Sequence, residues 1–370
     1  MASSHPIITV ISERLENFAR SRAAEVDGDA VFGASTARDA VAGLLLQHAT
    51  EAFASGKRLR ARFAYWGWRA QTGASGDIPD HVLDLGACLE VFQAAALVHD
   101  DIVDNSDTRR GRPATWRALE AAHRERKWSG SPEEFGRSGA ILLGDLLLGW
   151  SDDLLEEALA AVEPVNAART RRDYARMRRD VILGQFLDIA EEAAWPVTPD
   201  AEHAERAMRI AVLKSARYSV QQPLLMGAAI GGSDERTRRS LAAIGEPLGL
   251  AFQLRDDVLG VFGDPDVTGK PAGDDLREGK RTLLVAYARE RMDAAERARF
   301  DARLGADDLS NDEIEGLQHT VTSTGALELV ERSISTYAAA ANEEITSAGF
   351  DPASTAELRE LVTATTMRSS

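Results

Sequence analysis

Apolar residues recur along most of the chain at spacings of three and four positions, which is the period of an α-helix. Alanine, a strong helix former, is abundant between them, and no segment alternates apolar and polar residues as a half-buried strand does. Amphipathic helices are predicted over residues 6–25 and 36–55, separated by the glycine- and aspartate-rich turn VDGDAVFGAS. The pattern indicates an all-α fold.

Further helices are predicted over residues 84–99 and 140–150, both mostly apolar and therefore buried, and from residue 283 to the end. The polar segment 123–139 interrupts the pattern and is predicted to be a surface loop. Asp145, within the second apolar helix, is expected to be buried and hydrogen-bonded. No linker divides the 370 residues, so a single domain over residues 1–370 is expected.

Composition narrows the class of protein. The net charge of −16 disfavours nucleic acid and anionic membrane surfaces as partners. No apolar run is expected to reach the roughly 18–20 residues that a membrane span needs, and the start of the chain lacks a signal-peptide pattern. The single cysteine, Cys88, stands in an apolar run and is expected to be a buried structural thiol. A cytoplasmic enzyme without an integral membrane segment is the expectation.

Three carboxylates occur at helical spacing in LVHDDIVDNSDTRRGRP, residues 97–113. Asp100, Asp101 and Asp104 share one helix face, where like charges repel and a cation should bind. Carboxylate oxygens suit Mg²⁺, which takes its other ligands from water and substrate phosphates. Arg109 and Arg110 follow with planar donor groups that match phosphate oxygens. This stretch predicts half of a metal-diphosphate site, with His99 beside it as a structural neighbour.

A second acidic motif lies in FQLRDDVLGVFGDPDVTGKPAGDDLREGKRTLL, residues 252–284. Asp256 and Asp257 form the pair, Gln253 is one turn upstream, and the position that matches Asp104 is Gly260. Two such segments can chelate metals from opposite walls of one cleft. Lys270 and Lys280 follow as candidate diphosphate-binding cations.

An EF-hand count offers a competing interpretation of the same region. Loop positions 1, 3, 6 and 12 are occupied by Asp264, Asp266, Gly269 and Asp275. Position 12 is not glutamate, and a proline lies inside the loop, so calcium binding is disfavoured.

These motifs resemble the trans-isoprenyl diphosphate (polyprenyl) synthase family, and their pattern is closest to geranylgeranyl diphosphate synthases. DDIVD with RRG, and FQLRDD with TGKPAGDDLREGKRT, carry the resemblance, which spans residues 50–285. It implies an isoprenoid synthase fold with helices around a deep central cleft, in which residues 6–55 and 281–370 belong to the same domain. It also implies three Mg²⁺ ions and a homodimer.

The resemblance assigns roles to particular residues. The magnesium ligands would be Asp100, Asp101, Asp104, Asp256 and Asp257. The diphosphate of isopentenyl diphosphate would be held by Gly56, Lys57, Arg60, Arg110 and Gln93, where many members have histidine. The allylic diphosphate would be bound by Arg109, Lys214, Ser215, Gln253, Lys270 and Lys280, with Gln185 and Asp188 in support. The aspartates, Arg109 and Lys214 would act in catalysis.

The implied reaction joins isopentenyl diphosphate to an allylic diphosphate through an allylic carbocation. One helical turn, about 5.4 Å, is close to one isoprene unit. Ala95 and Ala96, one turn before Asp100, would leave space for the growing tail, and Phe92 would be its floor, which favours a C20 product, geranylgeranyl diphosphate. Farnesyl or longer products, a class I terpene cyclase and a non-catalytic partner subunit are the alternatives. Lys57, Arg60 and the RRG motif argue against a cyclase, which needs no isopentenyl site.

Overall fold

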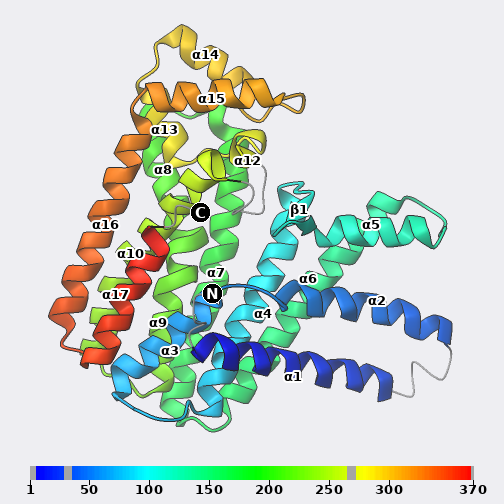
Figure 1. Cartoon of the computed structure of the whole chain (residues 1–370), viewed down its shortest axis with the longest axis vertical. Helices are drawn as coiled ribbons and strands as arrows, with labels where there is room; N and C mark the ends of the chain where they lie inside the picture. Colours follow the sequence, from blue (N-terminus) through cyan, green and yellow to red (C-terminus); the bar gives the residue numbers. More distant parts are fainter. Residues whose placement is uncertain (1–5, 29–35, 265–271, 368–370) are drawn as a thin grey trace. The chain divides into compact units, whose positions relative to one another are not determined.

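The structure, a computed structural model, describes residues 6–28, 36–264 and 272–367, and these are helical almost throughout (Figure 1). The helices of the first half are α1 Pro6–Gly28, α2 Thr36–Phe53, α3 Leu59–Thr72, α4 Asp80–Val103, α5 Thr115–Glu125, α6 Pro132–Leu159 and α7 Pro164–Ala194. Those of the second half are α8 His203–Ile210, the π-helix Ala211–Gln221, α9 Gln222–Ile230, α10 Glu235–Phe262, α12 Asp274–Arg277, α13 Leu283–Glu290, α14 Ala294–Arg303, α15 Asn311–Ser323, α16 Ala326–Ala348 and α17 Pro352–Thr366. The predicted all-α class is confirmed.

The chain divides into two compact units. Unit 1 comprises Met1–Tyr65 and Ser75–Ala167, and unit 2 comprises Trp66–Ala74 and Ala168–Ser370. Each unit contains one of the two acidic motifs. The expected single domain over residues 1–370 stays a prediction.

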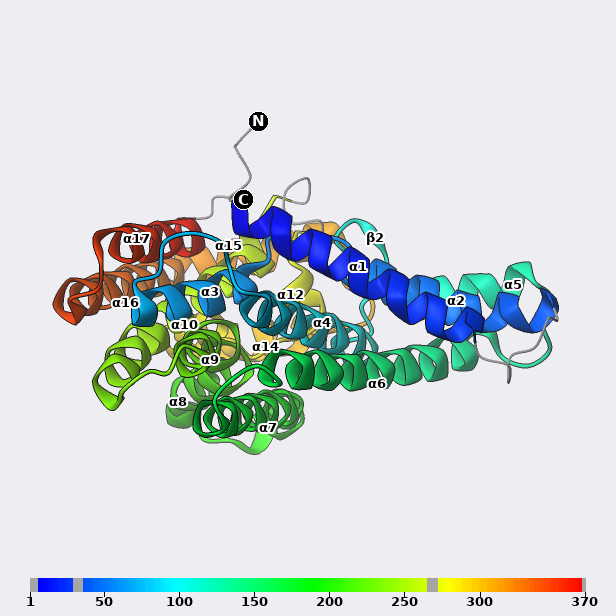
Figure 2. The same cartoon turned by 90° about the horizontal axis from the view of Figure 1, so that it is seen from below.

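Unit 1 is organised around α4, which packs mainly against α6 and lies between α6 and α1 (Figure 2). Leu85 and Leu89 of α4, and Leu143 and Leu147 of α6, each have an exposed fraction of 0%. Burying each such side chain stabilises the fold by about 1.5–3 kcal/mol. The helix that ends in the first aspartates is therefore a rigid core element, and Cys88 within it is buried, as predicted.

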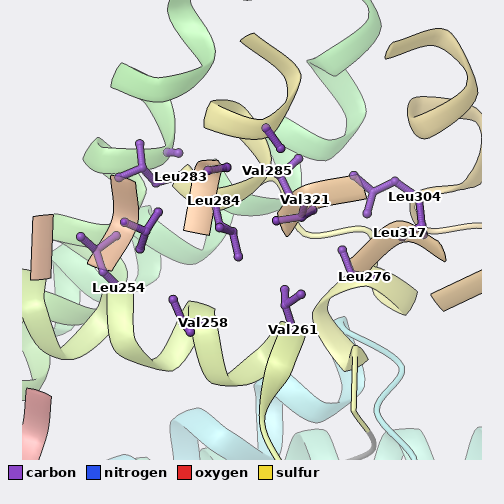
Figure 3. Packing of buried hydrophobic residues seen from close by; sticks show 14 of the residues in the cluster. Leu254, Val258, Val261, Leu276, Leu283, Leu284, Val285, Leu304, Leu317 and Val321 are labelled. Atoms are coloured by element: carbon purple, nitrogen blue, oxygen red, sulfur yellow. The ribbon is translucent and has the colours of Figure 1, made fainter. Parts of the chain in front are cut away.

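Unit 2 is organised around α10, which packs against α16 and the π-helix. Leu254, Val258 and Val261 line the buried side of α10 (Figure 3). They contact a cluster of leucine and valine side chains contributed by α12, α13 and α15, among them Leu276, Leu283, Leu284, Val285, Leu317 and Val321. This packing fixes the helix that carries the second acidic motif.

The prediction of a loop over residues 123–139 was wrong for most of that segment. Helix α5 continues to Glu125, and α6 begins at Pro132, so residues 126–131 alone lie between the helices. Ser131 caps α6 by accepting a hydrogen bond from the backbone N–H of Glu134, and proline occupies the first turn. The polar residues after Ser131 therefore form the solvent-exposed first turn of α6 and do not interrupt the helix. The expected burial of Asp145 was also wrong, because its side chain is 62% exposed.

Two features depart from the sequence expectations in smaller ways. A two-residue strand β1, Thr108–Arg109, pairs antiparallel with β2, Arg112–Pro113, just after the first aspartates.

Helix α4 is also long and apolar enough to cross a membrane, with a mean hydropathy of 1.5. The expectation that no run reaches this length was wrong, but 78% of that stretch is buried in the protein, as in a core helix.

Asp84 in α4 provides a pH-dependent test of unit 1. Burial raises the pKa of its carboxyl from 3.8 to about 6, against the opposing effect of Arg14, whose guanidinium lies 3.3 Å away. Because the folded state favours the protonated acid, this group lowers the free energy of unfolding progressively as pH rises from about 4 to about 6. Urea unfolding of Asp84→Asn should lack this loss, on the order of 1–3 kcal/mol. An identical pH dependence in both proteins would contradict this assignment.

Candidate active site

The first acidic motif lies at the carboxyl end of α4. Asp101 is 2% exposed and accepts a hydrogen bond from Arg109 Nε at 2.8 Å. Arg109 Nη2 also lies 3.6 Å from Asp100 Oδ2. Asp104 ends the helix, its backbone N–H donating to the carbonyl of Asp100. The cation expected over the aspartates is thus supplied in part by Arg109.

A short hairpin places Arg109 and Arg110 beside this helix end. Arg110 and Gly111 both have positive φ angles, +53° and +72°, which allow the tight turn between β1 and β2. Trp116 donates its indole N–H to the carbonyl of Ser106 at 2.8 Å and anchors the loop before the hairpin. Tight turn geometry, rather than helical periodicity, brings the two arginines back toward α4.

Arg137 of α6 fixes the same end of α4, a role that sequence reasoning missed. Its guanidinium donates to the carbonyl of Ile102 at 3.3 Å and to the side chain of Asn105 at 2.6 Å. Carbonyls at the end of a helix lack partners within the helix, so this contact stabilises the last turn. Arg137 stood in the segment predicted to be a loop.

The structure brings the start of the basic turn Ser55–Arg60 together with Arg110. Arg110 Nη1 donates to the carbonyl of Ser55, and a side chain at Gly56 would begin 3.3 Å from Arg110 Nη2. Burial lowers the pKa of Arg110; Glu90 opposes this, while Arg58, Arg109 and Arg60 lower it further. Several guanidinium groups therefore gather in unit 1, where they can attract an anion.

A cavity of about 350 Å³ adjoins this group of arginines within unit 1. It lies among α2, α4, α5 and the hairpin, and its lining includes Ser55, Leu97, Asp101, Arg109 and Arg110. The cavity at this end of α4 is therefore lined both by charged side chains, such as Asp101 and Arg109, and by apolar ones, such as Leu97.

The residues predicted to set chain length differ in their exposure. Ala95 is fully buried and Phe92 is 3% exposed, whereas Ala96 and Gln93 are partly exposed. Gln93, Ala96 and Asp100 lie at i, i+3 and i+7, so they share one face of α4. Phe92, at i−4 from Ala96, lies on the same face, and Ala96 is the one of the three predicted chain-length residues that is partly exposed there.

His99 has the structural role that the sequence suggested. Its Nε2 lies 3.2 Å from the carbonyl of Ile141 and 3.7 Å from Asp145 Oδ1. A side chain at Gly144 would begin 2.2 Å from the same nitrogen. Gly144 therefore allows the imidazole to pack closely against α6.

In unit 2, Lys214 of the π-helix forms an ion pair with Asp188 of α7, with Nζ 2.6 Å from Oδ2. Ser215 beside it is 7% exposed, and Gln185 lies one turn before Asp188 on α7. A π-helix is rare and often marks a functional site. Unit 2 therefore contains the predicted lysine and carboxylate as an ion pair. The π-helix that carries the lysine was not predicted from the sequence.

Gly184 permits the close approach of these two helices. A side chain at this position would begin 2.4 Å from the backbone nitrogen of Lys214. Gly184→Ala should lower the free energy of unfolding by about 1–3 kcal/mol, because the backbone must shift. Gly316→Ala in α15, which has no neighbour within 4 Å, is the matched control and should be neutral or stabilising. Equal effects in urea unfolding would contradict this explanation.

In the second acidic motif, too, several carboxylates lie close to one another. Asp257 is 7% exposed and accepts a hydrogen bond from Gln253 at 2.7 Å, as expected for side chains one turn apart. Burial raises the pKa of Asp257 to about 8, and the carboxylates of Asp275, Asp256 and Asp188 contribute to the rise. A cation placed here would relieve this repulsion.

Gly260 has a structural explanation. A side chain there would begin 2.1 Å from Asp275 Oδ2, so a carboxylate from α12 occupies the space one turn beyond the aspartate pair. Lys280 lies 3.5 Å from Asp275 and 2.5 Å from Glu278. Sequence reasoning considered Asp275 only in the EF-hand count. Asp266 and Gly269 of that count, and Lys270, lie outside the described residues.

The donor chemistry fits magnesium, since carboxylates predominate and Asp257 is surrounded by like charges. Within residues 6–28, 36–264 and 272–367, no three histidine, cysteine, aspartate or glutamate side chains form a group that could hold a metal ion. The predicted set of five aspartate ligands therefore stays a prediction. Water and substrate phosphates are the ligands that Mg²⁺ would take in addition.

Comparison with solved structures first identifies the class of fold. The structure resembles a crystal structure of geranylgeranyl pyrophosphate synthase from Corynebacterium glutamicum complexed with isoprenyl diphosphate and magnesium. The two chains are 37% identical, with a TM-score of 0.89 over 99% of each chain. This likeness confirms the predicted isoprenoid synthase fold.

Sequence comparison then identifies the family. The family model for polyprenyl synthetase matches residues 43–321. Geranylgeranyl diphosphate synthase of Mycobacterium tuberculosis is 34% identical over 66% of this chain, which spans 62% of that relative's length. Geranylfarnesyl diphosphate synthase of Aeropyrum pernix is 30% identical over 84% of this chain and 88% of its own length. The chain belongs to the polyprenyl synthetase family.

Proposed function

We propose that this protein is a magnesium-dependent trans-prenyltransferase that condenses isopentenyl diphosphate head-to-tail with an allylic diphosphate. The observation that carries the proposal is the contact between Arg110 and the turn at Ser55 and Gly56. It gathers guanidinium groups beside the first aspartate motif, as a second diphosphate substrate requires. The family to which the chain belongs supports the same activity.

In this mechanism the two acidic motifs, Asp100, Asp101 and Asp104 with Asp256 and Asp257, would hold Mg²⁺, three ions by family resemblance. Bound there, Mg²⁺ would neutralise the allylic diphosphate and assist its departure. Arg109 and Lys214 would donate hydrogen bonds to the same diphosphate as its charge develops. Gln253, Ser215, Lys270 and Lys280 would complete its binding.

The second substrate would be held by Lys57, Arg60, Arg110 and Gln93, so that its double bond faces the allylic carbon. Cleavage of the carbon–oxygen bond produces an allylic cation, which water would trap. The apolar part of α4 around Ala96 would exclude water from it. The double bond then attacks the cation, and the proton lost from the adduct passes to the released diphosphate.

We propose geranylgeranyl diphosphate, C20, as the product. Ala96, a small side chain one turn before Asp100, leaves room for a prenyl tail on that face of α4. Relatives named for C20 and C25 products are similarly distant, at 34% and 30% identity, so relatedness does not choose between these lengths. The proposal also includes a homodimer and a cytoplasmic location.

Labelled isopentenyl diphosphate, incubated with the purified chain and with C5, C10 or C15 allylic primers in turn, tests the activity. Magnesium-dependent label in C20 prenyl diphosphate is expected. Conversion of a single allylic diphosphate into a hydrocarbon, without isopentenyl diphosphate, would instead identify a terpene cyclase. The absence of turnover by the chain alone would favour a partner subunit.

A further inference from the structure

Arg58 differs from its neighbours in the basic turn. The residue is 3% exposed, whereas Gly56 and Lys57 are exposed. Its φ angle is +50°, in the left-handed region that residues with side chains rarely adopt. Such a conformation costs free energy and persists only where the surrounding contacts determine it. The contacts of Arg58 are therefore informative.

The guanidinium of Arg58 binds the end of α2. Nη1 donates to the carbonyl of Phe53 at 2.8 Å, and Nη2 donates to that of Ala54 at 3.1 Å. These carbonyls stand where a helix leaves its acceptors without partners inside the helix. Nε also donates to Ser12 Oγ of α1 at 3.2 Å. One buried side chain thus holds the start of the turn to two helices.

Glu90 of α4 continues this network. It is 7% exposed, and its Oε2 lies 3.9 Å from Arg58 Nη1. Its Oε1 accepts a hydrogen bond from the backbone N–H of Ala61, in the first turn of α3, at 3.2 Å. Arg58 and Glu90 therefore connect both ends of the turn, at α2 and α3, to the helix that carries the first aspartates.

We propose that Arg58 and Glu90 are positioning residues for the isopentenyl diphosphate site. They fix the turn that presents Gly56 and Lys57, and Arg110 in turn donates to the carbonyl of Ser55 in that turn. The pair acts through these neighbours and does not touch the substrate. This inference rests on the proposed function and deepens it, because it explains how two buried charged residues, Arg58 and Glu90, hold the substrate-binding turn in place.

The test compares KM for the two substrates in Arg58→Met, Arg58→Lys and Glu90→Gln. KM for isopentenyl diphosphate should rise about 10- to 100-fold in Arg58→Met and Glu90→Gln, since a displacement of about 1 Å can cost up to 10²-fold. KM for the allylic diphosphate should stay unchanged. Arg58→Lys, which retains the charge but not the planar donor group, should restore part of the loss.

Arg22→Met is the matched control. Arg22 is a partly buried arginine of α1, 19% exposed, that pairs with Glu157 of α6 away from the turn. Its loss should lower the Tm without changing the ratio of the two KM values. The same unchanged ratio in the Arg58 and Glu90 variants would overturn the proposal. If Arg58→Met does not fold, the other two variants decide.

A second readout separates this inference from the proposed function. Calorimetric Kd values for inorganic diphosphate require no turnover; measured without Mg²⁺, on which the allylic diphosphate site depends, they should weaken in the same variants, but not in Arg22→Met. A wild-type chain that forms no elongated product would refute the prenyltransferase activity, while the diphosphate titration would still test the turn. Equal Kd values in all variants would overturn the positioning role.

Discussion

Asp100→Asn is expected to lower kcat about 10²- to 10³-fold, the size typical of losing one electrostatic contact that strengthens in the transition state. Asp100 lies at the end of α4 beside Arg109, with a side chain 21% exposed. Asparagine preserves the shape of the side chain but removes the charge that would bind Mg²⁺. Folding should be little affected, because Asp101, not Asp100, makes the buried pair with Arg109.

Steady-state kinetics over a range of Mg²⁺ concentrations measure this effect. The concentration of Mg²⁺ for half-maximal rate should rise together with the fall in kcat. Asp107→Asn is the control, because Asp107 is 66% exposed and pairs with Arg117 at the surface, where an ion pair is worth little. A variant at Asp100 that retains full kcat and the same Mg²⁺ dependence would contradict its role as a ligand.

Ala96→Tyr is expected to shorten the products by one or two isoprene units. Side chains of a helix point toward its amino end, so a tyrosine at this position would extend along α4 away from Asp100. Each turn of about 5.4 Å corresponds to roughly one isoprene unit. Chromatography of the dephosphorylated products measures the change, and an unchanged length would reject this path for the tail.

The neighbouring positions provide the comparison. Ala95 is fully buried, so Ala95→Tyr should mainly destabilise the fold, by about 1–3 kcal/mol of overpacking, in addition to any shortening. Phe92→Ala should lengthen the products if the ring is the floor of the tail path. Phe92 is 3% exposed, and its loss from a packed core costs about 3–5 kcal/mol, so product length must be measured at a temperature where the variant is folded.

The sequence predicted the helices, and the contact between Gln253 and Asp257 within one of them, because both depend on local spacing. Helical periodicity placed Gln253 beside Asp257, and their side chains are hydrogen-bonded. Family resemblance placed Gly56 and Arg110 at one substrate, and they lie together in unit 1. Motif spacing was also sufficient for the family, which the match over residues 43–321 confirms.

The sequence did not reveal contacts that depend on tertiary packing. Arg58 stands in a basic run that is typical of a solvated surface, yet its guanidinium is buried because the end of α2 offers it carbonyl acceptors. Asp275 occupies the space at Gly260 because α12 folds back against α10. Neither contact has a characteristic sequence spacing. Each joins two segments across a turn, and helical periodicity does not predict the path of a turn.

Hydrophobic patterning also gave two wrong expectations for α6. The polar start of this helix, with Ser131, Glu133 and Arg137, has the composition of a loop, although a capping serine before a proline indicates a helix start. Asp145 was expected to be buried because its neighbours are apolar. In the structure its side chain is on the exposed face, beside the partly exposed His99.

The central proposal is that two acidic motifs, far apart along the chain, bind one magnesium-diphosphate cluster. A crystal structure with Mg²⁺ and a non-cleavable allylic diphosphate analogue tests it most directly. We expect Asp100 and Asp256 to coordinate Mg²⁺ ions that share the same diphosphate. Electron density that places these two aspartates in separate cavities, with the diphosphate bound to only one of them, would contradict the proposed mechanism.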